Sequence, residues 1–126
     1  MNNVILMGRL TADPILKTTP ASKHVTTFTL AVQRRFAQEG QQQADFITCV
    51  AWEKTAEFIT RYFRKGSMIA IDGRIQTRTW ENESGKKQYA TEVIVLNAYF
   101  TGEKQDREPS NGFETMTDYN EDDIPF

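Results

Sequence analysis

The sequence predicts an all-β domain, a closed five-stranded barrel with one helix between its third and fourth strands, followed by a disordered acidic tail. Three observations support this prediction. Five segments before Gly102 alternate apolar and polar residues and are rich in β-branched side chains, as half-buried strands are. One segment between them has apolar residues at helical spacing. After Gly102 the chain is polar, acidic and poor in aliphatic residues, which is typical of disorder.

The predicted strands have a period of two, and in the second of them Phe28, Leu30 and Val32 fall on one face. Polar connections separate the strands at 11–22 and 37–44, and "NESGKK" at 82–87 is predicted to be the hairpin turn between the two longest strands. The five expected strands are Asn3–Leu10, Thr27–Gln33, Asp45–Trp52, Ser67–Trp80 and Gln88–Phe100.

The helix is predicted over "KTAEFITRYFRKG", Lys54–Gly66. Ala56, Ile59 and Phe63 lie at helical spacing, two cations occupy the expected last turn, and Gly66 is a standard helix stop. Five strands in an antiparallel barrel with a helix between the third and fourth are the plan of the OB-fold. That fold binds oligonucleotides or oligosaccharides across one face, although a fold alone does not define a function.

Charge is distributed unevenly along the chain. Residues 1–102 carry thirteen Lys or Arg against nine Asp or Glu, a net charge of +4, whereas residues 103–126 carry two against eight, a net charge of −6. We therefore expect two parts, an OB-fold domain over 1–102 and a disordered acidic tail over 103–126. A basic body with an acidic tail is a pattern found among nucleic-acid-binding proteins.

Cysteine and histidine are too scarce for a disulfide or a Cys/His metal cluster, because Cys49 and His24 are the sole examples. Cys49 is expected to be a small core residue and His24 a polar residue at the start of a strand. Neither a signal peptide nor a membrane-spanning segment is expected. These features predict a protein of the reducing cytoplasm, with no Cys/His metal site and no membrane partner.

The candidate binding face begins on the fourth predicted strand. Arg74, Arg78 and Trp80 alternate on one face of it, together with Met68, Ala70, Asp72 and Gln76. The opposite face, with Ile69, Ile71 and Ile75, is expected to be core. Lys86 and Lys87 lie in the adjoining hairpin turn and add two further cations.

The third predicted strand contributes two more rings. Phe46 and Trp52 share a face with Thr48 and Val50 and stand about 20 Å apart, at roughly 3.3 Å per residue. The smaller apolar set of Ile47, Cys49 and Ala51 suits the barrel interior. At the end of the second strand, "QRRF" adds Arg34, Arg35 and Phe36.

This mixture of rings and cations is what single-stranded nucleic acid requires, since cations follow the phosphates while aromatic rings stack on bases of any sequence. Two alternatives remain open. The rings could pack at a subunit interface, in which case the barrel mainly oligomerises. The chain could also be a nuclease, which requires carboxylates close together to hold a metal. No motif brings Asp13, Asp45, Asp72 and Glu92 together, so an enzyme is not expected.

Six segments resemble the bacterial single-stranded DNA-binding protein family: "NNVILMGRLTADP", "FTLAVQRRF", "ADFITCVAWEKTAE", "YFRKGSMIAIDGRIQTRTW", "YATEV" and the terminal "DDIPF". The resemblance implies an OB-fold homotetramer that binds single-stranded DNA without sequence preference, with no catalytic activity and no cofactor. The apolar outer surface that such an assembly would use is expected around Val4, Leu6, Tyr99 and Phe100. The family's stacking positions correspond here to Phe36, Phe46, Trp52 and Trp80. Two of these are Phe where some relatives carry Trp, which implies somewhat weaker stacking.

The chain ends on an unusual combination, in which three acids are followed by Ile124, Pro125 and Phe126. The resemblance implies that this ending docks replication, repair and recombination proteins, and that the protein is associated with the nucleoid. The apolar residues would be anchors, Pro125 would limit the entropy lost on binding, and Asp122 and Asp123 would suit a basic rim. A merely solubilising tail explains the acids but not the apolar ending.

Overall fold

Six strands and one helix form the part of the chain that the computed structural model describes, residues 1–102. The predicted tail lies outside these described residues. The short β2 falls inside a segment predicted to be a loop, and the other five strands match the five predicted ones. In chain order the elements are β1 (Val4–Leu10), β2 (Lys17–Thr18), β3 (His24–Gln33), β4 (Ala44–Trp52), α1 (Glu53–Tyr62), β5 (Met68–Glu81) and β6 (Lys87–Tyr99).

The five long strands close into a barrel in the order β1–β5–β6–β4–β3, because β1 pairs with both β5 and β3. This confirms the predicted fold class. All pairings are antiparallel except β4 with β6, which run parallel where Cys49 lies opposite Val93 and Val50 opposite Ile94. The expectation of a wholly antiparallel barrel is therefore wrong at this one seam, where the β3–β4 and β5–β6 hairpins meet side by side.

Two glycines lie where the backbones of neighbouring strands approach too closely for a side chain, Gly8 between β1 and β3 and Gly73 between β5 and β6. A Cβ atom at Gly8 would lie 2.5 Å from the carbonyl oxygen of Ala31, and one at Gly73 would lie 2.1 Å from that of Ile94. The β5–β6 register also shifts between Asp72 and Gly73, which marks a bulge. The extra residue is Leu96 of β6, and Gly73 is the position on β5 where the two backbones lie too close for a side chain.

The core fills the barrel and the space beneath α1. Phe58, Ile59 and Phe63 are buried from the helical segment. The ring of Phe100 packs on them, with its centroid 5.2 Å from that of Phe58 and 5.3 Å from that of Phe63. The barrel contributes residues that alternate along the strands, namely Leu10, Phe28, Leu30, Cys49, Ala51, Ile69, Ile71, Val93 and Val95.

The helix is shorter than predicted and ends at Tyr62 rather than Gly66. Phe63 is already extended, with φ −121° and ψ 148°, and its side chain is fully buried. Gly66, at φ +86°, belongs to the turn closed by the bond from the Ser67 N–H to the Arg64 carbonyl. The prediction that Gly66 stops the helix is therefore wrong. The helix ends earlier because Phe63 adopts an extended conformation and is buried, which the local sequence does not reveal.

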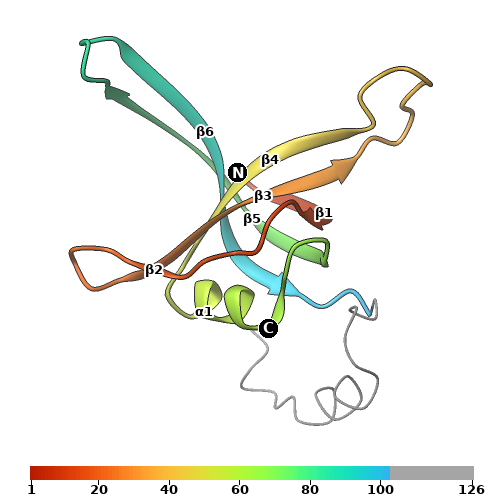
Figure 1. Ribbon diagram of the computed structural model, residues 1–126, viewed down its shortest axis with the longest axis horizontal. Coiled ribbons are helices and arrows are strands. Elements are labelled where there is room, and N and C mark those ends of the chain that lie inside the picture. Colours follow the sequence, from red (N-terminus) through yellow and green to blue (C-terminus); the bar gives the residue numbers. More distant parts are fainter. Residues whose placement is uncertain (103–126) are drawn as a thin grey trace.

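The β5–β6 hairpin continues beyond the barrel, on the side away from α1 (Figure 1). The isoleucine face predicted to be core is therefore buried at Ile69 and Ile71 but exposed at Ile75. The predicted hairpin turn is confirmed: the Asn82 side-chain oxygen accepts bonds from the N–H groups of Ser84 and Lys86. Within residues 1–102, no helix is long and apolar enough to span a membrane.

Candidate nucleic-acid interface

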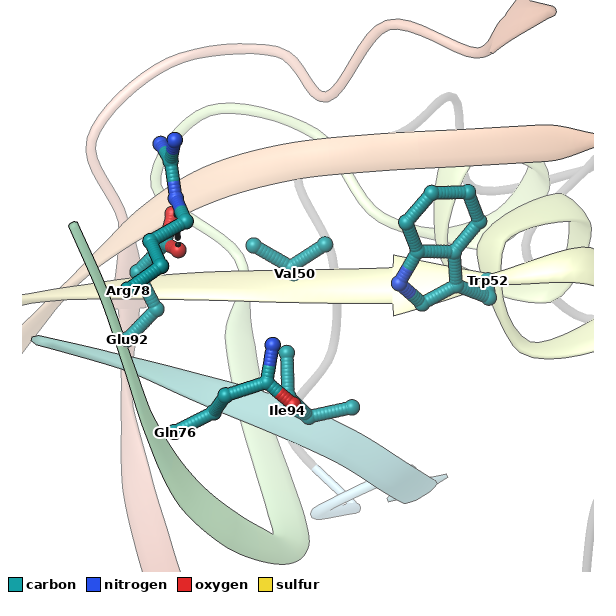
Figure 2. A pocket seen from close by; sticks show the side chains of 6 residues that line it. All are labelled: Val50, Trp52, Gln76, Arg78, Glu92 and Ile94. Atoms are coloured by element: carbon teal, nitrogen blue, oxygen red, sulfur yellow. Dashed lines mark hydrogen bonds and ion pairs between the residues drawn. The ribbon is translucent and has the colours of Figure 1, made fainter. Parts of the chain in front are cut away.

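A hollow of about 210 Å³ lies on the outer surface, where β4, β5 and β6 meet. Figure 2 shows Val50 between two walls, with Trp52 on one side and the Arg78 and Glu92 side chains on the other. The parallel seam creates this arrangement, because it places Val50 of β4 directly opposite Ile94 of β6. Six residues line the hollow: Val50, Trp52, Gln76, Arg78, Glu92 and Ile94.

All four predicted stacking rings reach the surface. Phe36 is 86% exposed, Phe46 62%, Trp52 41% and Trp80 42%. Large aromatic side chains that remain this exposed contribute little to the core of a monomer, which makes these four rings candidates for a binding surface. We call Phe46 and Trp52 of β4, with Arg74, Arg78 and Trp80 of β5, the aromatic face.

The alternation predicted for β4 is confirmed, since Cys49 and Ala51 are buried while Phe46 and Trp52 face outward. Trp52 ends the strand and also precedes the helix. The next residue, Glu53, has a left-handed φ of +54°, which turns the chain sharply into α1. This turn keeps the indole at the rim of the hollow rather than under the helix.

On β5, Arg78 contacts two other functional candidates. Its Nε donates a hydrogen bond of 2.7 Å to Glu92 Oε1, and its guanidinium carbon lies 4.5 Å from the centroid of the Trp80 ring. The contact with Trp80 is a cation–π interaction. The structure thus joins the predicted Arg78 and Trp80 with a carboxylate that sequence reasoning had placed among scattered acids.

The cluster at the end of β3 is only partly available to a phosphate. The Arg34 Nη2 and Asp45 Oδ1 atoms are 2.7 Å apart, and this hydrogen bond lowers the pKa of the Asp45 carboxyl below its usual value. Arg34 therefore enters any binding site already paired. Arg35 lies over the Phe36 ring, 5.5 Å from its centroid, in the connection between β3 and β4.

The remaining predicted cations differ in position. Arg74 is exposed on the aromatic face and has no ion pair with any other residue of the described barrel. Lys86 lies in the turn. Lys87 pairs with Glu81, whereas Trp80 pairs with Gln88. Because side chains alternate, Lys87 leaves the hairpin on the face opposite Trp80, so the structure does not group it with the aromatic face.

Sequence reasoning missed Glu92 as a member of the site. Its contact with Arg78 spans fourteen positions and depends on the β5–β6 register. A signal was present: counting outward from the predicted turn pairs Glu81 with Lys87 and therefore Gln76 with Glu92, as observed. The prediction used the turn to separate the strands but did not count this register.

Within the described barrel, the structure does not bring together the carboxylates that the nuclease alternative requires. Among residues 1–102, no three His, Cys, Asp or Glu side chains lie close enough together to hold a metal ion. The four carboxylates are engaged separately: Asp13 accepts from the Lys65 N–H, and Asp72 from Asn97 and Tyr99. Burial raises the pKa of the Cys49 thiol to about 12, consistent with the inert core residue expected there.

A closed OB barrel with exposed rings and arginines on one outer face defines an OB-fold binding protein. Residues 1–101 match the Single-strand binding protein family, and the chain belongs to this family. Membership confirms both the resemblance and the expectation that the chain is not an enzyme, because the family consists of non-enzymatic binding proteins.

The chain is similar to several bacterial proteins, and the share of each relative that it covers differs. The chain is 47% identical to single-stranded DNA-binding protein 1 of Streptococcus pyogenes serotype M18, covering 100% of this chain and 99% of the relative. It is 46% identical to single-stranded DNA-binding protein 3 of Listeria innocua, covering 97% and 79%. Identity to the single-stranded DNA-binding protein of Bacillus cereus is 51%, covering 89% of this chain but 63% of that protein.

Proposed function

We propose that the barrel binds single-stranded DNA without sequence preference, through the aromatic face and the adjacent Arg34, Arg35 and Phe36. The observation that carries this proposal is the combination of exposed rings with arginines beside the hollow between β4, β5 and β6. Rings stack on bases of any sequence, and cations neutralise the backbone. The names of the similar proteins support the same ligand.

The experiment that tests this function is titration with oligo-dT while the fluorescence of Trp52 and Trp80 is followed at two salt concentrations. Both indoles are exposed, so stacking of bases should quench them. Binding should weaken as salt rises, because counterions are released from the DNA. A protein that assembles but leaves oligo-dT unbound would instead support the oligomerisation-only alternative.

Two of the proposed phosphate contacts, Arg74 of the aromatic face and Arg34 at the end of β3, are expected to contribute unequally to the salt dependence of binding. Arg74→Ala should reduce the slope of log K against log salt by about 0.7, the share of one phosphate on a single strand. Arg34→Ala should reduce it less, because Arg34 is already paired with Asp45. The measurement is a set of oligo-dT titrations across salt concentrations, with circular dichroism to establish that both variants fold. Equal reductions would contradict the unequal roles.

We further propose a homotetramer, as the family resemblance implies. The sequence had placed the apolar outer surface around Val4, Leu6, Tyr99 and Phe100. That choice is wrong for three of the four, because Val4, Leu6 and Phe100 pack against the core. The apolar residues that face outward on β1 are instead Ile5 and Met7, and they are better candidates for a subunit interface.

The assembly is tested by light scattering at micromolar concentration, where a tetramer is expected. Substituting both Ile5 and Met7 with Lys should shift the mass toward smaller species, since buried charges oppose association. The same double substitution should leave the secondary structure intact, because both side chains point away from the core. A wild-type protein that is monomeric under these conditions overturns the tetramer.

We further propose that the tail recruits proteins of replication, repair and recombination. The protein itself is proposed to be cytoplasmic and associated with the nucleoid. Deletion of Glu121–Phe126 should abolish capture of such partners from cell extract, because a short peptide depends on few anchors. Phe126→Ala alone should cause most of the loss, while Asp122→Asn should act mildly and mainly at low salt. The pull-down is run beside an oligo-dT titration on the same preparations.

The DNA titration separates the two roles of the chain. Removing the acidic ending should leave oligo-dT affinity unchanged or slightly higher, because an acidic tail competes with phosphates for a basic surface. Unchanged partner recovery by the truncated protein would exclude a docking peptide. Loss of DNA binding would instead assign the tail to the DNA site.

A further inference from the structure

One carboxylate lies where a polyanion is proposed to approach. Glu92 lines the hollow, is 9% exposed, and is the single charged residue buried within residues 1–102. A negative charge in a DNA groove repels phosphates, so electrostatics alone gives Glu92 an unfavourable effect on binding. A positive role must therefore act through something other than its own charge.

The contacts of Glu92 lead directly to one of the proposed stacking rings. Glu92 lies opposite Gln76, and Arg78 and Trp80 follow on the same face of the hairpin. Glu92 Oε1 accepts the 2.7 Å hydrogen bond from Arg78 Nε, and the Arg78 guanidinium carbon stands 4.5 Å from the Trp80 ring centroid. The three side chains form a continuous row from the buried floor to the exposed ring.

Trp80 lies in the part of the β5–β6 hairpin that extends beyond the barrel, where few other elements can fix the orientation of its ring. Pairing of β5 with β1 ends at Gly73, and from Arg74 to Glu81 the only strand that pairs with β5 in the described barrel is β6. The indole therefore depends on side chains of its own hairpin for its orientation. Arg78 lies over one face of the ring and Trp80 as a whole is 42% exposed, so stacking of a base is assigned to the opposite face.

Glu92 in turn determines where Arg78 lies. The Glu92 carboxylate accepts a hydrogen bond from Arg78 Nε, which orients the guanidinium plane without using its two terminal nitrogens. Figure 2 shows the guanidinium standing beside the Glu92 carboxylate on the wall opposite Trp52. Arg78 is a long side chain, 54% exposed, that would otherwise sample many rotamers.

We propose that Glu92 is a positioning residue for DNA binding, which holds Arg78 over Trp80 so that the free face of the indole is presented to a base. The inference rests on the proposed binding of single-stranded DNA. Its physical basis is preorganisation: ordering a rotamer-rich side chain on binding lowers affinity roughly two- to tenfold, and the hydrogen bond to Glu92 removes that loss.

Repulsion of phosphates by Glu92 lowers DNA affinity, whereas positioning of Arg78 by Glu92 raises it. Glu92→Gln separates these two effects. This substitution preserves size and removes the negative charge. Electrostatic repulsion alone predicts tighter binding to oligo-dT, whereas positioning predicts binding weaker by roughly two- to tenfold. Glu81→Gln is the matched control, because it makes the same charge change on an exposed position of the same hairpin. The control should bind as tightly as the wild type or slightly more tightly.

A double-mutant cycle with Arg78→Ala identifies the route of the effect. In the Arg78→Ala background, Glu92→Gln should cause no further loss of affinity, because the residue through which it acts is absent. Additive losses would show that Glu92 acts independently of Arg78. Tighter binding by Glu92→Gln, to the extent seen for Glu81→Gln, would show that Glu92 is only a repulsive charge. Either result overturns the proposal.

A second readout follows the ring itself. In a Trp52→Phe background, collisional quenching of Trp80 by acrylamide without DNA should increase on Glu92→Gln, as Arg78 leaves the ring. Unchanged quenching contradicts the proposal. Should Glu92→Gln fail to fold, Arg78→Lys tests the same contact, because Lys keeps the charge but lacks the planar group that stacks. Weaker binding at an unchanged salt slope is then expected, and unchanged affinity overturns the proposal.

The wild-type titration separates this inference from the function on which it rests. Wild-type protein that does not bind oligo-dT contradicts the proposed function itself. Wild-type binding without a loss in Glu92→Gln contradicts only the positioning role of Glu92.

Discussion

Alanine at Gly73 is expected to lower the free energy of unfolding by about 3 kcal/mol, the upper part of the range for overpacked positions. Its Cβ atom would lie 2.1 Å from the Ile94 carbonyl oxygen, which belongs to the backbone of β6 and not to a side chain that could turn away. Relief therefore requires the two strands to separate at the bulge. Urea unfolding followed by circular dichroism, at one fixed protein concentration, measures the change.

Gly40→Ala is the matched control. Gly40 has a left-handed φ of +85°, but a Cβ atom there would meet nothing within 4 Å. Its substitution should cost about 1–2 kcal/mol from backbone strain alone. Gly73 shows the opposite combination, with no left-handed φ but a severe contact. A Gly73→Ala variant no less stable than Gly40→Ala would mean that the strands approach less closely than described.

Loss of either tryptophan of the aromatic face should weaken oligo-dT binding by about 1–3 kcal/mol, roughly five- to 150-fold. Trp52 and Trp80 are both partly exposed, and neither belongs to the core cluster. Trp52→Ala and Trp80→Ala should therefore fold normally and lose affinity through lost stacking. Anisotropy of a labelled oligo-dT is the measurement, because the substitutions remove the intrinsic fluorescence signal.

Tyr89→Ala provides the control on the same hairpin. Tyr89 pairs with Thr79, so its side chain leaves the hairpin on the face opposite Trp80, and it is 72% exposed. Its removal should change affinity little. If Tyr89→Ala costs as much as Trp80→Ala, DNA contacts both faces and the assignment of a single aromatic face is wrong. If a tryptophan variant unfolds instead, that ring is structural.

Most of the fold could be predicted because strand and helix patterns are local. Ile69 and Ile71 alternate with the more exposed Met68, Ala70 and Asp72, and their burial confirms this predicted pattern. The burial of Cys49 and Ala51 confirms the pattern predicted for β4 in the same way. A residue's side of a strand depends only on its position in the pattern, provided that the strand stays in the barrel. The proviso failed at Ile75, which lies where β5 has left the barrel.

The surface exposure of candidate site residues could be predicted where it depends only on the alternation along a single strand. Phe46, Trp52 and Trp80 reach the surface as expected. The sequence did not reveal that Arg34 is paired with Asp45, that Lys87 faces away from Trp80, or that Glu92 holds Arg78. Each of these facts depends on two strands and on the register between them.

The sequence by itself determined the identity and order of the barrel strands, the outward position of the aromatic rings and the separation of a basic body from an acidic tail. Tertiary structure alone decided the parallel β4–β6 seam, the early end of α1 at Tyr62, and the hollow that joins Trp52 to Arg78 and Glu92. The physical reason is that alternation and charge are carried by consecutive residues. Closure, by contrast, brings together residues far apart in the chain, through close backbone contacts such as that between Gly8 of β1 and Ala31 of β3.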